Sequence, residues 1–150
     1  MTAYIDSSVV LRYILKGENS IRHALECDKV ISSEIMEIEC RRVIHRYRMQ
    51  NELDDQAFVI AVQRLEEFLD GVSIIKLSEA VKKIAMGAFP VIIKTLDALH
   101  VATALEYAKV YSDEKVSIYS YDESMNRCAC VLGFDVPFFK IKSKEKMFLG

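Results

Sequence analysis

The sequence predicts an α/β fold: a three-layer α/β/α sandwich around a central, mainly parallel sheet of about five strands. Short apolar runs that suit buried strands alternate along the chain with longer segments of helical periodicity. Strands separated by helices pair in parallel, and right-handed crossovers place the helices on both faces of the sheet. The chain has 150 residues, of which 51% are hydrophobic. We therefore expect residues 1–150 to form a single domain with a full core, its tail after about residue 140 loosely held.

The first third of the chain alternates short apolar runs with turn and capping residues. A run at 2–5 ends at Asp6, and a helical pattern follows the two serines after it. Ser32 and Ser33 supply capping hydroxyls for a long helix that runs to about Met49. We expect, in order, a strand at 2–5, helices at 7–15 and 21–26, a strand at 29–31 and the helix that ends near 49.

The remaining two thirds continue the alternation. Gly71 and Gly133 each end a helical pattern, and Gly87 and Pro90 interrupt the chain before the helix for which Thr95 is the expected N-cap. We expect helices at 53–69, 79–86, 95–105 and 123–132, with strands at 72–77, 115–121 and 136–139.

One acid is out of place in the helix that contains T-L-D-A-L-H-V-A-T-A-L. On a helical wheel Asp97 points in the same direction as Val101 and Ala104, on the face that such a helix buries. An unpaired buried charge is costly, so Asp97 must meet a positive charge or lie at the mouth of a cleft. The alternative is that Asp97 only favours the positive end of the helix dipole, an effect of about 0.3–1 kcal/mol.

Three further acids are expected near Asp97. Asp6 and Asp122 each end a strand and begin a helix, so they lie along one edge of a parallel sheet, where ligands bind in such folds. Glu39 lies inside the apolar arc of the early part of its helix. Simpler explanations exist, because Asp6 can be only an N-cap and Glu39 can form an ion pair with Arg42.

Four carboxylates in one place would repel one another, and a cation would remove that repulsion. Ligation by oxygen alone, without histidine or thiolate, suits Mg²⁺ or Mn²⁺. Such an ion can polarise a phosphoryl oxygen and lower the pKa of a water for attack on a phosphodiester. We expect Asp97 and Asp122 to be ligands, and Asp6 and Glu39 to bind a second ion or to orient the water.

Hydroxyl groups and a histidine flank these acids. Ser7 follows Asp6, and Ser120 lies two residues before Asp122, so either can hydrogen-bond a carboxylate or a phosphate; both can also be ordinary turn and strand hydroxyls. His100 lies one turn past Asp97 but off its face, which favours a structural role.

A basic helix face contrasts with the net charge of −2. That net charge argues against a protein that holds nucleic acid by bulk charge, so any such contact must be a local patch. The helix ending near residue 49 offers one, and within it we assign Arg42 and Arg46 as candidate RNA contacts; the alternative is an ordinary solvated face. The patch comprises Arg41, Arg42, His45, Arg46 and Arg48.

The sequence also indicates the cellular location of the protein and the state of its cysteines. The sequence contains no apolar run near the roughly 20 residues that span a membrane, and its start lacks the pattern of a signal peptide. We therefore expect a cytoplasmic protein without membrane contact. Four cysteines show no paired zinc spacing, so we expect buried thiols rather than metal ligands or disulfides.

Four segments, Y-I-D-S-S, S-S-E-I-M-E-I-E-C-R-R, L-D-A-L-H-V-A-T-A-L and S-Y-D-E-S-M, resemble in order and separation the PIN-domain ribonucleases. The likeness is strongest to the VapC-type toxins of prokaryotic toxin–antitoxin pairs, and it covers essentially the full chain. Carried across, the four acidic positions of the family fall on Asp6, Glu39, Asp97 and Asp122, and Ser120 matches the family's Ser/Thr.

The resemblance implies a Mg²⁺- or Mn²⁺-dependent endoribonuclease that acts on RNA such as tRNA, rRNA or mRNA. It further implies a homodimer and a small antitoxin that inserts near the acidic groove. Three alternatives remain open from the sequence: a housekeeping RNA-processing nuclease, a PIN-like RNA- or protein-binding module that no longer cuts, and a phosphoacceptor of the receiver type. The last is disfavoured because Asp6-Ser7-Ser8 lacks the paired acids that a receiver needs.

Overall fold

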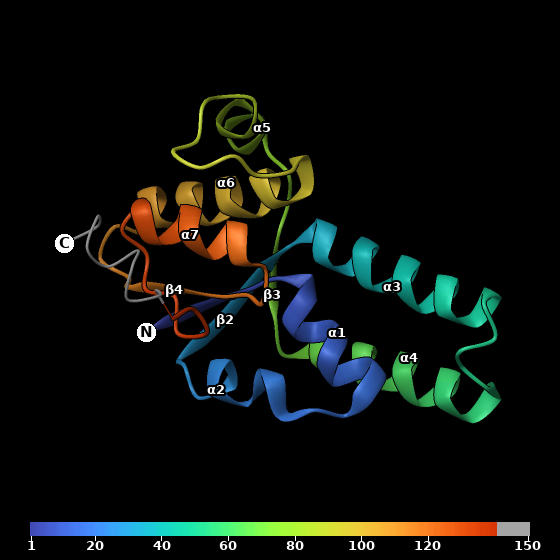
Figure 1. Ribbon diagram of the computed structural model, residues 1–150. Coiled ribbons are helices and arrows are strands. Elements are labelled where there is room, and N and C mark those ends of the chain that lie inside the picture. The colour runs from blue at the N-terminus through green and yellow to red at the C-terminus, as the bar shows by residue number, and fades with distance from the viewer. Residues whose placement is uncertain (141–150) are drawn as a thin grey trace.

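A parallel sheet of four short strands lies at the centre of the molecule (Figure 1), in a computed structural model that describes residues 1–140. The strand order is β3-β2-β1-β4, and each neighbouring pair is parallel. The strands are β1 (Thr2–Ile5), β2 (Lys29–Ser33), β3 (Ser73–Ile75) and β4 (Val116–Tyr119). The expected loose tail lies outside the described residues.

Helices cover both faces of this sheet, as the sequence predicted. In Figure 1, α5, α6 and α7 lie above the sheet, while α1 and α2 lie below it and the α3–α4 pair projects to the right. The helices are α1 (Ser7–Lys16), α2 (Arg22–Leu25), α3 (Glu34–Met49), α4 (Asp55–Asp70), α5 (Glu79–Ala85), α6 (Thr95–Val110) and α7 (Glu123–Val131). A 3₁₀ turn, η1 (Asn19–Ile21), leads into α2.

The alternation of side chains along β1 divides the core in two. Ala3 and Ile5 pack below the sheet with residues of α1, α3 and α4. Tyr4 points to the other face and packs with residues of α6, α7 and β4. Every residue of β1 and β4 is buried, so these two neighbouring strands are covered on both faces rather than half-exposed.

Capping side chains stop the strands and start the helices. The carboxylate of Asp6 accepts a hydrogen bond from the backbone N–H of Val9 in α1, and the hydroxyl of Ser33 accepts one from Ile35 in α3. Ser78 opens α5 and Asp122 opens α7 in the same way. Each of the four strands in residues 1–140 therefore ends at or is followed by a short polar capping side chain near the carboxyl end of the sheet.

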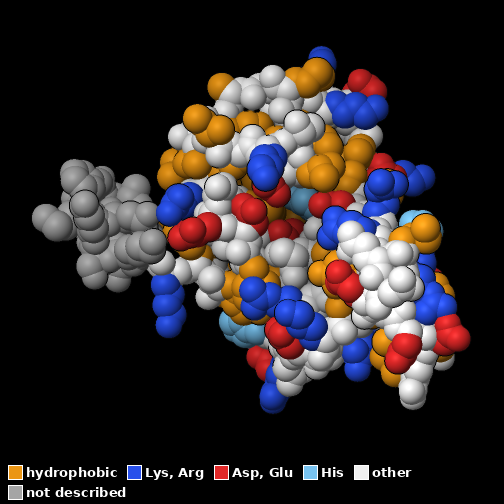
Figure 2. Space-filling model, turned by 45° about the vertical axis from the view of Figure 1, so that its right-hand side comes forward, with side chains coloured by type: hydrophobic (Ala, Val, Ile, Leu, Met, Phe, Trp, Pro, Cys, Tyr) orange, Lys and Arg blue, Asp and Glu red, His pale blue; other side chains and the backbone are white. Residues whose placement is uncertain are grey.

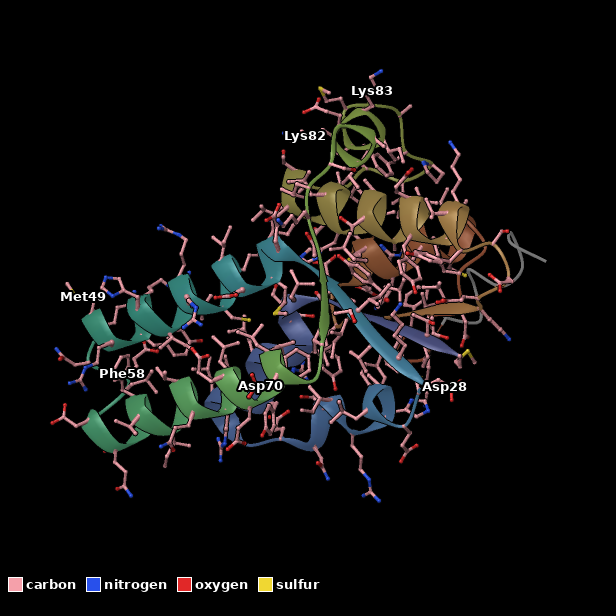
Figure 3. All side chains as sticks on the ribbon, turned by 180° about the vertical axis from the view of Figure 1, so that it is seen from behind. Asp28, Met49, Phe58, Asp70, Lys82 and Lys83 are labelled. Carbon is pink, nitrogen blue, oxygen red and sulfur yellow. The ribbon has the colours of Figure 1, made fainter. Side chains whose placement is uncertain are left out.

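The helix α4 packs beside α3, and together they form an antiparallel pair that extends away from the sheet. Figure 3 shows this pair from behind, with Met49 near the outer end of α3 and Phe58 near the outer end of α4. No helix within residues 1–140 is long and apolar enough to cross a membrane.

Two expected details were wrong. The last strand, expected at 136–139, is reduced within the described residues to a single bridge between Asp135 and Ser117, so the sheet has four strands there. Pro137 supplies no backbone N–H for a ladder, and Phe138 instead stacks on Tyr121. The N-cap of α6 is Lys94 rather than Thr95, and no side chain caps that helix.

Candidate active site at the carboxyl ends of the strands

The strand order creates a switch point between β1 and β4. The chain runs from β1 outward through β2 to β3, and then returns to place β4 on the other side of β1. In open α/β sheets, ligands bind outside the carboxyl ends of the strands at such a point. Asp6 follows β1, and Ser120 and Asp122 follow β4, so these three residues flank the switch point.

Asp6 is the buried centre of this region, with only 3% of its surface exposed. Its Oδ1 accepts hydrogen bonds from the hydroxyl of Ser8 at 2.6 Å and from the N–H of Val9 at 3.3 Å. Its Oδ2 accepts one from the hydroxyl of Ser120 at 2.6 Å. Burial nevertheless raises the pKa of Asp6, because these bonds only partly replace the lost hydration of the charge.

Ser120 links the two strand-end acids. Its Oγ donates to Asp6 and also accepts from the backbone N–H of Asp122 at 2.9 Å. The carbonyl of Ser120 accepts from Nδ2 of the buried Asn126 at 2.8 Å, which fixes the turn between β4 and α7. Oδ1 of Asp122 caps α7 through the N–H of Met125 at 2.7 Å.

Asp97 lies in the first turn of α6 and is partly buried, while Val101 and Ala104 of the same helix are fully buried. Burial and the negative charges of Asp122, Asp6 and Glu39 together raise the pKa of Asp97 to about 6, against a smaller lowering effect of His100. The other three acids that the sequence singled out are therefore close enough to Asp97 to repel its charge. The helix-dipole alternative does not account for this, because a helix N-terminus lowers the pKa of an acid.

Glu39 reaches this region from α3 and meets a histidine rather than an arginine. Its Oε1 lies 2.7 Å from Nε2 of His100 on α6, whose Nδ1 lies 2.6 Å from the hydroxyl of Tyr4 on β1. The expected alternative, an ion pair between Glu39 and Arg42, is not formed within the described residues. His100 is 1% exposed, so its expected structural character fits its burial, but its contact with Glu39 was not foreseen.

Of the two serines after Asp6, only Ser8 hydrogen-bonds to its carboxylate. Ser7, for which the sequence left open a hydrogen bond to a carboxylate or phosphate or an ordinary turn hydroxyl, is the buried first residue of α1 and bonds to no carboxylate within residues 1–140. The hydroxyl of Ser8 takes that place, and it also accepts from the N–H of Tyr121 at 3.0 Å. The signal for Ser8 was present in D-S-S, since a hydroxyl two residues after an N-cap can fold back on its carboxylate.

Acidic side chains gather around a hollow near the middle of the face in Figure 2, with Lys and Arg side chains around it. Within residues 1–140, no three His, Cys, Asp or Glu side chains are grouped closely enough to enclose an ion by themselves. Mg²⁺ does not require this, because it keeps several waters and binds through one or two carboxylates. The donor set fits such an ion, since it is all oxygen and carries mutual repulsion that a cation would relieve.

The basic face of α3 contains both paired and unpaired arginines. Arg41 donates to Glu37 and to Glu66, at 2.7 Å each, and Arg48 pairs with Asp55. Arg42 and Arg46 are exposed and have no acidic partner within the described residues. Together with neighbours on α3 they line an open hollow of about 520 Å³, whose walls are Arg41, Arg42, Val43, His45 and Arg46.

Comparison with known proteins gives one family and several solved structures of similar fold. A sequence model of the PIN domain matches residues 3–128. No curated protein sequence matches the chain. A chain in the crystal structure of VapBC2 from Rickettsia felis, bound to a DNA fragment from their promoter, superposes with a TM-score of 0.62 at 13% identity. The match covers 91% of this chain and 97% of that one, and at this identity it concerns the fold.

Proposed function

Because the chain belongs to the PIN-domain family, whose members are generally nucleases, we propose that it is a metal-dependent endoribonuclease that hydrolyses phosphodiester bonds in RNA. The observation that carries the proposal is the raised pKa of Asp97, about 6, produced by burial and by three other carboxylates at the switch point of the sheet. Perturbed pKa values of this kind cluster at functional sites, and a bound cation would relieve the repulsion.

We assign each acid a role from its surroundings. Asp97 and Asp122 would hold the Mg²⁺ or Mn²⁺ ion, because they lie nearer the surface than Asp6. When bound, the ion supplies positive charge to the scissile phosphate and lowers the pKa of a water. Asp6 is buried under Ser8 and Ser120, and it orients the turn that carries Asp122.

Glu39 and Ser7 complete the assignment. Glu39 is held by His100 and would orient the attacking water or a second ion. Ser7 remains a candidate for a hydrogen bond to a substrate phosphate, because its hydroxyl is not engaged by a carboxylate in the described residues.

The substrate would run from the acids along α3. Arg42 and Arg46 lie three and seven residues after Glu39, which places them on the same side of the helix as Glu39. At 1.5 Å per residue, Arg46 is about 10 Å along the helix from Glu39. Two exposed guanidinium groups at this spacing suit the phosphates of an RNA strand that leaves the acidic site. We propose RNA (tRNA, rRNA or mRNA) as the substrate on this basis.

We further propose that the protein is the toxin of a type II toxin–antitoxin pair, that it forms a homodimer, and that a small antitoxin inhibits it. The support is the similarity of fold to a chain of VapBC2, together with the four quoted sequence segments. A cytoplasmic location follows from this proposal, since the RNA substrate is found there.

RNA cleavage tests the enzymatic proposal directly. Purified protein is incubated with total RNA and Mg²⁺ or Mn²⁺, with EDTA, and as the Asp97→Asn variant. Cleavage should require the ion and should be lost in the variant. Asp113→Asn, the same change at an exposed position away from the acids, serves as the matched control and should cleave normally. Cleavage that ignores both EDTA and Asp97→Asn would reject the proposal.

Two further assays address the alternatives. Growth arrest on expression, relieved by co-expression of a small neighbouring open reading frame, supports a toxin, while normal growth favours a housekeeping RNA-processing nuclease. Tight RNA binding that needs no metal and gives no turnover would favour a non-cleaving PIN-like module.

A further inference from the structure

A chain of three polar side chains crosses the core beneath the acidic site. Tyr4 on β1, His100 on α6 and Glu39 on α3 are linked by contacts of 2.6 and 2.7 Å. Tyr4 and His100 are 0% and 1% exposed. Burying a phenol and an imidazole among apolar residues costs free energy unless each polar atom is satisfied, and here each one is.

The contacts fix the orientation of the imidazole. Oε1 of an ionised Glu39 can only accept, so Nε2 of His100 must carry a proton and donate it. In the neutral imidazole, Nδ1 then accepts from the hydroxyl of Tyr4. The ring therefore has a donor that faces Glu39 and an acceptor that faces the sheet, and a 180° flip would break both contacts.

The contact also constrains Glu39. A glutamate side chain has three rotatable bonds, and immobilising it costs up to about 2 kcal/mol of conformational entropy. The side chain of Glu39 is 23% exposed, and its Oε2 has no hydrogen-bond partner within residues 1–140. His100 therefore holds one oxygen of the carboxylate and leaves the other available at the site.

We propose that His100, held in turn by Tyr4, is a positioning residue that orients Glu39 so that its free oxygen serves the divalent ion or the attacking water. This inference rests on the proposed function. It goes beyond the four acids, because it adds a buried element that spans β1, α6 and α3 and determines how one of those acids is presented. Outer partners of this kind typically change metal affinity by about 10- to 100-fold when they are removed.

Binding of Mn²⁺ alone tests the inference without relying on turnover. The free ion is measured by electron paramagnetic resonance during titration of the full chain. We expect His100→Leu, which removes the donor, to weaken Mn²⁺ binding about tenfold. Tyr4→Phe, which only loosens the ring, should weaken it about threefold. His100→Gln restores an N–H donor at the position of Nε2 and should recover most of the affinity.

Two controls separate positioning from general stability. Ser117→Ala removes another buried hydroxyl of the sheet, whose partner is Asp135, and should lower the melting temperature without changing Mn²⁺ affinity. In a Glu39→Gln background, Tyr4→Phe and His100→Leu should have no further effect on affinity, because the group through which they act is gone.

The outcomes distinguish the two proposals. If wild-type protein binds Mn²⁺ and the folded Tyr4→Phe and His100→Leu variants bind it equally well, the positioning role is wrong and the proposed function stands. An undiminished effect of either variant in the Glu39→Gln background also overturns the positioning role. If the wild-type protein itself fails to bind Mn²⁺ or to cleave RNA, the proposed function fails, and the inference fails with it.

Discussion

The acids at the two ends of the sheet have pKa values that are shifted in opposite directions. At the amino ends of the strands, Asp28 pairs with the N-terminal ammonium group at 2.7 Å, and Glu114 accepts hydrogen bonds from Thr2 and Tyr107. These partners hold the pKa values of Asp28 and Glu114 below their usual range. At the carboxyl ends, burial and mutual repulsion raise the pKa values of Asp6 and Asp97.

This difference supports the proposal that the acids at the amino end stabilise the fold, whereas those at the carboxyl end bind a metal ion. Each acid at the amino end has a cation or a donor of its own, so its charge favours the folded state. Asp97 has other acids as its main charged neighbours, so its ionisation opposes folding. A bound cation would remove this unfavourable repulsion, so the carboxyl end of the sheet is where we expect a cation to bind.

The largest expected effect comes from neutralising an acid at the carboxyl end. Asp122→Asn should reduce RNA cleavage about 1,000-fold, since a loss of several kcal/mol of transition-state stabilisation corresponds to that factor. Asparagine is itself a good N-cap, so α7 should keep its cap and the variant should fold. Glu114→Gln, at the amino end, should cleave like the wild type but melt at a lower temperature. If Asp122→Asn and Glu114→Gln lost activity equally, the acids at the two ends of the sheet would not differ in function.

The next effect concerns the hydroxyl that joins two of the acids. Ser120→Ala leaves Oδ2 of Asp6 and the N–H of Asp122 without their partner, which should cost about 1–3 kcal/mol in the free energy of unfolding. Cleavage should fall as well, because the turn that carries Asp122 loosens. Thr2→Val removes a hydroxyl from the amino end and should lower stability only. Chemical denaturation and RNA cleavage, measured on both variants, check this pair.

The pH dependence of stability should have opposite slopes at the two ends. The pKa of Asp97 is raised from 3.8 to about 6, so the folded state binds more protons in that range and stability falls as pH rises through it. After allowance for its partial exposure, we expect about 1 kcal/mol from this group. The pKa of Glu114 is lowered, so its contribution is present above about 4.5 and is lost as pH falls.

Variants separate these two slopes. Denaturation of metal-free protein between pH 2.5 and 7 should show, in the upper part of this range, a weaker decline of stability with pH for Asp97→Asn than for the wild type. Glu114→Gln should retain the decline of stability near pH 6, and it should lose the increase of stability that the wild type shows as pH rises toward 4.5. A steeper decline in Asp97→Asn would contradict the assignment.

The smallest expected effect lies on α3. Arg42→Ala and Arg46→Ala should each raise KM for RNA a few-fold and reduce the salt dependence of binding, because each removes one phosphate contact. Arg41→Ala is the matched control, since Arg41 is already engaged by Glu37 and Glu66. A change in KM that is as large for Arg41→Ala would mean that general charge, rather than the guanidinium groups without an acidic partner, attracts the RNA.

Local signals were enough to predict most of the fold and the positions of three of the four candidate acids. Asp6 and Asp122 could be placed because an apolar run followed by a capping residue marks the end of a strand. Asp97 could be placed because a charge on the apolar face of a helix is visible on a wheel. Each of these inferences needs only a few neighbouring residues.

The features that were missed depend on contacts between distant segments. Glu39 and His100 are 61 residues apart. The residues around Glu39 do not indicate that its partner is this distant histidine rather than Arg42, one helical turn away. The expected strand at 136–139 has the right apolar composition, but a strand needs a partner for its N–H groups, and Pro137 has none to offer. Which of Ser7 and Ser8 bonds to Asp6 depends on the geometry of one turn.

Thermal unfolding with and without Mn²⁺ is the most direct test of the claim that a divalent ion relieves the repulsion among these acids. Without metal at pH 7.5, Asp97→Asn should melt about 2–4 °C above the wild type, as expected for about 1 kcal/mol in a chain of this size. Mn²⁺ at 100 times its dissociation constant should stabilise the wild type by about 2.7 kcal/mol and the variant far less. A metal-free variant that melts below the wild type, with equal shifts in Mn²⁺ for both proteins, would contradict the account.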